Sequence, residues 1–181
     1  TKIFIDGREG TTGLRIVSRF AQRDDVEWIS IPEEKRKDPK TRSDCINASD
    51  YTFLCLPDAA AKEAVGLVRN DHVRIIDAST AHRTAPGWAY GFPELSKEHR
   101  RQIALSHRVA VPGCYASGFA ACVYPLVTSG VITPDYPVCC HADIPVRGRK
   151  QSLFMKGLVG RFHMILPVSM HFRRRTNIYR R

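Results

Sequence analysis

A single cysteine carries the clearest chemical signal in this sequence. Cys114 lies in the run VPGCYASG (residues 111–118), between a strand-like apolar segment at 108–111 and a helical pattern from 116 to about 127. The unpaired amides and the macrodipole at a helix N-terminus favour the thiolate, which is the nucleophilic form of cysteine. Cys114 is therefore a candidate nucleophile. The alternative is a small buried apolar cysteine, which is the commoner fate of this residue type.

Three glycines near the N-terminus have the spacing of a phosphate-binding turn. Gly7, Gly10 and Gly13 form G-x-x-G-x-x-G between an apolar strand pattern at 2–6 and a helical pattern at 11–22. Glycines in this context permit a tight turn and a close approach of the backbone to a pyrophosphate at the helix N-terminus. The spacing differs from G-x-G-x-x-G, so a purely structural turn is the alternative to a dinucleotide site. The helical pattern at 11–22 rests on the spacing of Leu14, Val17 and Ala21.

The residues after the second expected strand favour NADP over NAD. A carboxylate at the end of that strand binds the ribose hydroxyls in NAD sites, but here the strand ends in Ile29-Ser30-Ile31-Pro32. The nearby positive cluster consists of Lys35, Arg36 and Lys37. These side chains suit the extra phosphate of NADP. The alternative is a solvated loop, which is the commoner fate of a charge run.

Strands and helices alternate along the first half of the chain. This order predicts right-handed βαβ units on a parallel sheet, which is the α/β doubly wound class. Further strands are expected at 26–31, 51–56 and 73–77, and a helix at 59–69 with Asp58 as its N-cap. Residues 33–42 are interpreted as a charged connection and 78–94 as a loop-rich section.

The pattern changes after residue 133. Pro134 and Pro137 bracket the entry to an apolar run at 138–142, where a new sheet is expected, and the periodicity is lost beyond Asp143. The sequence thus predicts a first domain at 1–133, which contains Cys114, and a second one at 134–181 that ends in a basic tail. Residues 143–181 contain 10 lysines and arginines and 1 acid, against 18 basic and 17 acidic residues before them. The net charge of +10 therefore describes the tail.

Composition limits the class of protein further. The six cysteines show no C-x-x-C pair and no zinc-ligand spacing, so we expect no metal site and reduced thiols in a cytoplasmic protein. The longest uninterrupted apolar stretch, at 119–127, is too short to cross a bilayer. We therefore expect no membrane partner.

Four local patterns in one order resemble a known family. They are DGREGTTGL from Asp6, DASTAHR from Asp77, YGFPE from Tyr90 and VPGCYASG from Val111. Together they resemble N-acetyl-gamma-glutamyl-phosphate reductase of the short type, over about residues 1–142, whereas 143–181 match nothing of it. The related aspartate-semialdehyde dehydrogenases carry Asn before the cysteine, where this chain has Gly113.

The resemblance implies a fold, a reaction and a set of residues. It implies a Rossmann-like domain, a substrate domain that is truncated or replaced here, and NADPH-dependent reductive dephosphorylation of N-acetyl-glutamyl 5-phosphate through a thioester on Cys114. That family also uses a downstream histidine as acid and base, for which none of the seven histidines is a convincing replacement. The implied pyrophosphate-binding residues are Gly7, Gly10, Thr11, Thr12 and Gly13; Leu56 and Pro57 border the nicotinamide; Ser79 and Arg83 bind the anionic substrate.

Two alternatives remain open at this stage. One is an aspartate-semialdehyde dehydrogenase-like enzyme. The other is a nucleotide-fold protein whose basic tail binds polyanions without specific recognition of nucleic acid. The resemblance further implies a homo-oligomer where the full family domain is present.

Overall fold

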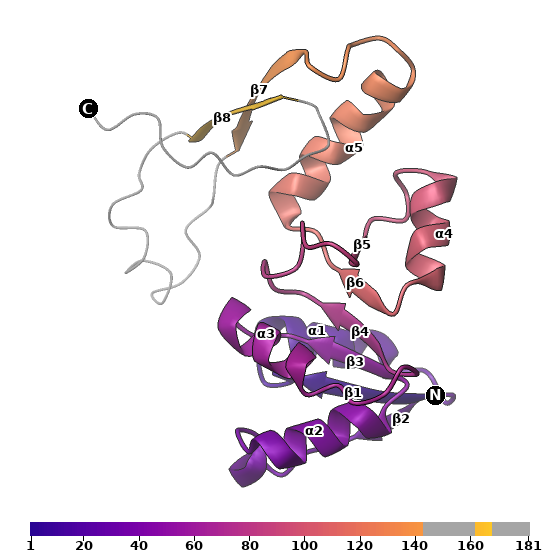
Figure 1. Ribbon diagram of the computed structural model, residues 1–181, viewed down its shortest axis with the longest axis vertical. Coiled ribbons are helices and arrows are strands. Elements are labelled where there is room, and N and C mark those ends of the chain that lie inside the picture. Colours follow the sequence, from indigo (N-terminus) through magenta and orange to yellow (C-terminus); the bar gives the residue numbers. More distant parts are fainter. Residues whose placement is uncertain (143–161, 168–181) are drawn as a thin grey trace, which may run out of the picture. The chain divides into compact units, whose positions relative to one another are not determined.

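The computed structural model describes residues 1–142 and 162–167, with side chains described up to residue 138 (Figure 1). The chain divides into two compact units, Thr1–Gly113 and Cys114–Arg181. The division falls between a strand and the helix of Cys114, whereas the domain boundary after residue 133 stays a prediction.

The first unit is built on a six-stranded sheet with the order β2-β1-β3-β4-β6-β5. All of its neighbouring strands pair in parallel, which confirms the doubly wound class. The strands are β1 (Lys2–Asp6), β2 (Glu27–Ile29), β3 (Tyr51–Leu54), β4 (Arg74–Asp77), β5 (Ala89–Tyr90) and β6 (Arg108–Ala110). The helices are α1 (Thr11–Phe20), a single 3-10 turn at Glu33–Lys35, α2 (Pro39–Ala48), α3 (Asp58–Gly66) and α4 (Lys97–Leu105).

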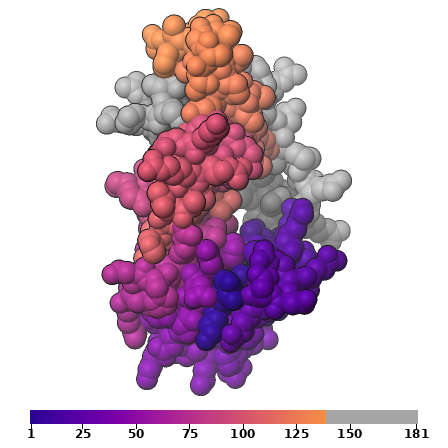
Figure 2. Space-filling model, turned by 90° about the vertical axis from the view of Figure 1, so that its right-hand side faces the viewer, coloured from indigo at the N-terminus to yellow at the C-terminus, as the bar shows by residue number. Residues whose placement is uncertain are grey.

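One face of this sheet forms the core. Phe4, Leu54 and Ile75 lie on it and are at most 1% exposed, because α2 and α3 cover them with Ile46 and two alanines. In Figure 1, α2 and α3 lie in front of the strands and α1, drawn fainter, lies behind them. β1 has a neighbouring strand on each side and buries four of its five residues. On the face that Figure 2 shows, the first residues form a small indigo patch.

The opposite face is covered by α1 and α4. Phe20 of α1 packs edge-on against Phe53 of β3, with ring centroids 6.1 Å apart. Arg74 of β4 donates to the carbonyls of Ile103 and Ser106 at the end of α4, where a cation complements the helix dipole. Helices therefore lie on both faces of the sheet, as the doubly wound class requires.

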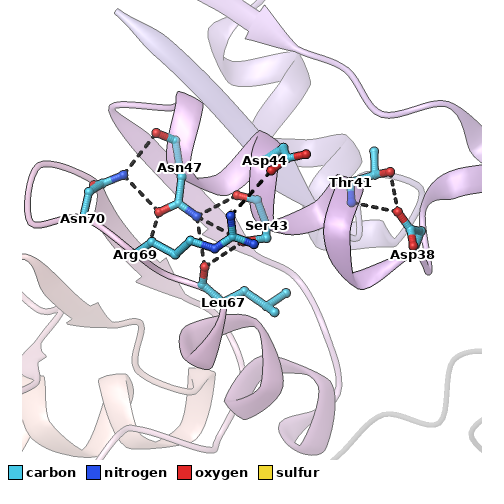
Figure 3. Close-up of polar contacts among 8 residues, drawn as sticks. All are labelled: Asp38, Thr41, Ser43, Asp44, Asn47, Leu67, Arg69 and Asn70. Carbon is cyan, nitrogen blue, oxygen red and sulfur yellow. Dashed lines mark hydrogen bonds and ion pairs between the residues drawn. The ribbon is translucent and has the colours of Figure 1, made fainter.

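Helix α2 was not expected from the sequence, which suggested a charged connection over part of it. Its start has a standard chemical signal, because the Asp38 carboxylate accepts the Thr41 amide and Pro39 occupies the first turn. Its far end is held by a polar network around Asn47 (Figure 3). The Asn47 amide donates to the Leu67 carbonyl at 2.9 Å, and its oxygen accepts the Arg69 amide at 2.7 Å. These bonds join α2 to the end of α3.

Other details of the prediction need correction. Leu14 is 55% exposed, and the buried residue of α1 is Gly13, which packs against the backbone of Gly7 and Arg8. The N-cap of α3 is Pro57 rather than Asp58; the Asp58 carboxylate binds the amide and hydroxyl of Thr80. The expected strands at 26–31 and 51–56 are each shorter, and the section at 78–94 contains β5.

The second unit begins with α5 (Cys114–Thr128), which starts two residues before the expected helix. The strand expected at 138–142 is present as β7 (Pro137–Ala142). It pairs antiparallel with β8 (Phe162–Pro167) in a separate two-stranded sheet, so a new sheet begins here as predicted. Of the basic tail at 143–181, residues 143–161 and 168–181 lie outside the described residues.

Candidate active site

The carboxyl ends of the strands bring the predicted cofactor and substrate segments of the first unit together. The parallel pairing continues past the strand ends through three amide-to-carbonyl bonds: Cys55 to Asp6 (2.8 Å), Ala78 to Leu54 (3.0 Å) and Val111 to Asp77 (2.8 Å). The loops that follow β1, β3, β4 and β6 therefore lie side by side at one edge. This edge is where ligands bind in open α/β sheets.

The glycine turn has the geometry that a pyrophosphate needs. Gly7 has φ +87°, and a Cβ at this position would lie 2.4 Å from the Cys55 carbonyl oxygen. A Cβ at Gly13 would lie 2.6 Å from the Arg8 carbonyl oxygen, so the turn and the start of α1 pack backbone to backbone. Gly10 is the N-cap of α1 and supplies no capping side chain. The first amides of α1 are thus available to an anion, and the residues fit a dinucleotide.

The other predicted cofactor residues border this turn. Leu56 and Pro57 follow β3, and the Leu56 Cδ2 would lie 3.2 Å from a Cβ at Gly7. Thr11 and Thr12 are the first two residues of α1 and are exposed. The structure thus brings all of the predicted cofactor residues to one edge; their roles remain predictions.

A buried ion pair lies directly before the turn. Both Nε and Nη2 of Arg42 donate to Asp6 Oδ2, at 3.0 and 2.9 Å, and Nη1 donates to Glu63 at 3.1 Å. Asp6 and Arg42 are each 6% exposed. Burial raises the pKa of Asp6, and the hydrogen bonds and positive charge of Arg42 act against that rise. This pair could not be predicted from local sequence patterns, because its partners are 36 residues apart.

Arg83 links the loop after β4 to the loop after β6. Its Nε donates to the Val111 carbonyl at 3.0 Å and its Nη2 to the Ala78 carbonyl at 3.4 Å. A Cβ at Gly113 would lie 2.8 Å from Arg83 Nη1, so glycine at this position leaves room for the guanidinium. No carboxylate in residues 1–138 forms an ion pair with Arg83. A guanidinium without a carboxylate partner suits a phosphate or carboxylate ligand.

Ser79 is engaged within its own loop. Its hydroxyl donates to Asp77 Oδ2 at 2.7 Å and accepts the Ala81 amide at 3.1 Å. The Asp77 carboxylate has a second partner, His82, which was not predicted from the sequence. The Nδ1 atom of His82 lies 2.6 Å from Asp77 Oδ2, and its ring stacks on Trp88. These contacts fix the loop that carries Arg83. The substrate-binding role of Ser79 stays a prediction, and its hydroxyl proton is donated to Asp77 in this conformation.

The described thiols differ in accessibility. Cys114 is the first residue of α5, one peptide bond beyond Gly113, and is exposed, as is Cys122. Cys55 lies half-buried beside the glycine turn, and burial raises its pKa to about 11, with smaller contributions from the charges of Asp6 and Asp77. Cys55 is therefore a poor nucleophile near neutral pH, whereas Cys114 and Cys122 are the exposed thiols among the described residues.

This difference predicts the order of thiol alkylation. With iodoacetamide at about pH 8, a thiol of pKa about 11 is only about 0.1% thiolate, so we expect Cys55 to react at least about tenfold more slowly than Cys114 and Cys122. Peptide mapping by mass spectrometry measures each rate. The rate at Cys55 should rise with pH up to about 11, since the thiolate is the reacting form. Equal rates at Cys55 and Cys114 near pH 8 would contradict the described environment.

A glycine turn at the carboxyl edge of a doubly wound sheet defines a dinucleotide-binding domain. Residues 25–103 match the family described as semialdehyde dehydrogenase, NAD binding domain. A solved aspartate semialdehyde dehydrogenase from Francisella tularensis has the same fold, with a TM-score of 0.60 at 15% identity over 78% of this chain and 44% of that one.

Three curated relatives that match this chain share one name. The N-acetyl-gamma-glutamyl-phosphate reductases of Chelativorans sp. and Trichormus variabilis are 54% and 51% identical to this chain over 152 and 155 residues, 84% and 86% of it. That of Burkholderia ambifaria is 53% identical over 140 residues, 77% of the chain. The predicted resemblance is confirmed, and the aspartate-semialdehyde alternative has less support. The 155 matched residues exceed the 142 covered by the four patterns, so the similarity extends at least 13 residues further.

Two facts bound what these relatives imply. The chain spans 44–49% of their length, which is less than half. The NAD-binding domain and the reductase relatives together confirm a nicotinamide dinucleotide as cofactor, and NADP fits the family. Separately, no helix in the described part of the chain is long and apolar enough to span a membrane.

Proposed function

We propose that the chain is the cofactor-binding and thioester-forming part of an NADPH-dependent reductase that converts N-acetyl-glutamyl 5-phosphate to its semialdehyde in arginine biosynthesis. The observation that carries the proposal is the glycine turn open to an anion, at the same sheet edge as Arg83. Cys114 follows one peptide bond beyond Gly113, against which Arg83 packs. The identity of 51–54% to N-acetyl-gamma-glutamyl-phosphate reductases over 84–86% of the chain supports the same assignment.

In the proposed reaction Arg83 binds the anionic substrate, because its planar fork can donate hydrogen bonds to two oxygens. The Cys114 thiolate attacks the acyl carbon, the bond from that carbon to the phosphate oxygen breaks, and inorganic phosphate leaves. An S-acyl thioester remains on Cys114. Bound NADPH supplies the hydride that reduces this thioester. The resulting thiohemiacetal collapses, returning its electron pair to sulfur and releasing the aldehyde.

The cofactor is assigned to residues of the first unit. The amides and glycines at Gly7, Gly10 and Gly13, with Thr11 and Thr12, hold the pyrophosphate. Leu56 and Pro57 supply an apolar border for the nicotinamide. The proposal includes a cytoplasmic location and a homo-oligomer of the complete protein. The alternative function, binding of polyanions by the basic tail, depends mainly on residues that lie outside the described part of the chain.

The acylation step tests the proposal directly. Mixing the chain with N-acetyl-glutamyl phosphate should release inorganic phosphate and add the acyl mass to Cys114, as read by intact-protein mass spectrometry and peptide mapping. Since the thiolate is the nucleophile, we expect Cys114→Ser to slow acylation at least about a thousandfold. Cys122→Ser, which removes the other exposed thiol of α5, should stay within about twofold of the unmodified chain.

Three results would oppose the proposal. They are acylation that persists in Cys114→Ser, acylation that occurs equally at Cys122, and wild-type protein that releases no phosphate. A parallel reaction with aspartyl phosphate separates the two acyl-phosphate substrates, and a faster reaction there would favour the aspartate-semialdehyde alternative.

A further inference from the structure

Arg8 projects from the glycine turn and is placed by an aromatic ring. Its guanidinium carbon lies 5.8 Å from the centroid of the Trp28 ring, within the range of a cation–π contact. Trp28 belongs to β2, which pairs with β1 through Ile3. Phe20 of α1 packs edge-on against the same ring at 6.2 Å. The platform beneath Arg8 is therefore fixed by the sheet and by α1.

This position is the one where a dinucleotide site distinguishes its two cofactors. In doubly wound folds the adenosine ribose lies at the ends of the first two strands, where an acid accepts the 2′-hydroxyl of NAD or an arginine accommodates the 2′-phosphate of NADP. After β2 the chain continues with Ser30, Ile31 and Pro32, so no acid follows the strand directly. The next acids along the chain, Glu33 and Glu34, belong to the 3-10 turn.

Arg8 is the best placed cation near this strand end. It is exposed, and no carboxylate in residues 1–138 forms an ion pair with it. Arg36, in contrast, is ion-paired with Glu33 at 3.7 Å. Lys35 and Lys37 are exposed and have no aromatic ring beneath them among the described cation–π contacts.

We propose that Arg8, held over Trp28, recognises the 2′-phosphate of NADPH and thereby makes this chain select NADPH over NADH. The inference rests on the proposed function, which supplies the bound dinucleotide. It assigns the selectivity for NADPH over NADH to the glycine turn, in place of the cluster at Lys35, Arg36 and Lys37. A guanidinium binds a phosphate through two parallel hydrogen bonds, and stacking on a ring keeps its plane oriented before the ligand arrives.

Equilibrium binding of the two nucleotides to the full chain tests the inference. Nicotinamide fluorescence titrations give Kd for NADPH and for NADH without any need for catalysis. We expect Arg8→Gln to weaken NADPH binding about 30-fold and to change NADH binding by less than about twofold, because only NADPH carries the 2′-phosphate. Arg8→Lys should restore a small part of the loss, since it keeps the charge and lacks the fork.

The matched control removes the competing cations. A Lys35→Gln/Lys37→Gln variant should lose less than about threefold in NADPH affinity, because exposed charges without fixed geometry are screened by salt. Thermal unfolding of each variant checks that the fold is intact.

The outcomes separate this inference from the cofactor proposal. Wild-type protein that binds both nucleotides equally overturns the role of Arg8 and leaves the dinucleotide site standing. Equal loss of NADPH and NADH in Arg8→Gln also overturns it, as does loss of selectivity in the lysine variant. Wild-type protein that binds neither nucleotide overturns the proposed function itself.

Discussion

Replacing Gly7 by alanine is expected to destabilise the first unit by about 3–5 kcal/mol. Two costs combine at this position. The positive φ of +87° is unfavourable for any residue with a Cβ, and the new Cβ would lie 2.4 Å from the Cys55 carbonyl oxygen. That oxygen belongs to the backbone just beyond β3, so it has no flexible side chain with which to give way. Urea unfolding followed by far-ultraviolet circular dichroism measures the loss.

Gly66 provides the matched control for this substitution. It is the last residue of α3, its φ lies outside the left-handed range, and a Cβ there would meet nothing within 4 Å. We expect Gly66→Ala to change the free energy of unfolding by about 1 kcal/mol or less, in the stabilising direction. Gly7→Ala protein as stable as Gly66→Ala would show that the turn does not have the described conformation.

The elements that sequence predicted well are those whose pattern is local. β1, β3 and β4 are short apolar runs, and their order along the chain suffices to indicate a parallel doubly wound sheet. Helices α2 and α4 were missed because they are mostly polar: α2 buries three of its ten residues and α4 none of its nine. A search for caps would have found α2, since Asp38 followed by Pro39 is a helix start.

The candidate site likewise contains parts that could be predicted from local patterns and parts that could not. The glycine turn and Cys114 are contiguous motifs whose flanking elements could be predicted, so their positions at a strand end and a helix start follow from local order. Contacts between distant segments could not be predicted in this way. The stacking of Arg8 on Trp28 and the pairing of Asp77 with His82 depend on how loops fold over the sheet edge.

The pairing of Asp6 with Arg42 is the contact of this kind with the largest expected effect. Both side chains are almost fully buried, and their separation along the chain ties the end of β1 to α2. We expect Arg42→Met to destabilise the unit by about 3–5 kcal/mol at pH 7, because it leaves a buried carboxylate without its compensating charge. Arg69→Met removes an exposed ion pair to Asp44 and should cost about 0.5 kcal/mol or less.

The pH dependence of Arg42→Met identifies the carboxylate as the cause. Burial already raises the pKa of Asp6, and the substitution removes the hydrogen bonds and the positive charge that lower it. An acid whose folded-state pKa lies above its unfolded value binds more protons when folded, so stability falls as pH rises through the folded pKa. Arg42→Met should therefore regain stability as the pH is lowered from about 7 towards about 5, relative to the wild-type protein.

The double variant Asp6→Asn/Arg42→Met completes the argument, because it removes both charges and leaves groups of similar size. It should recover at least about half of the stability lost in Arg42→Met, and the additional pH dependence should disappear. Urea unfolding of the four proteins between about pH 5 and pH 8 forms a double-mutant cycle in which the coupling energy is itself pH-dependent. A coupling energy near zero at every pH would mean that Arg42 stabilises the end of β1 through the packing of its side chain, and that Asp6 is neutral in the folded protein.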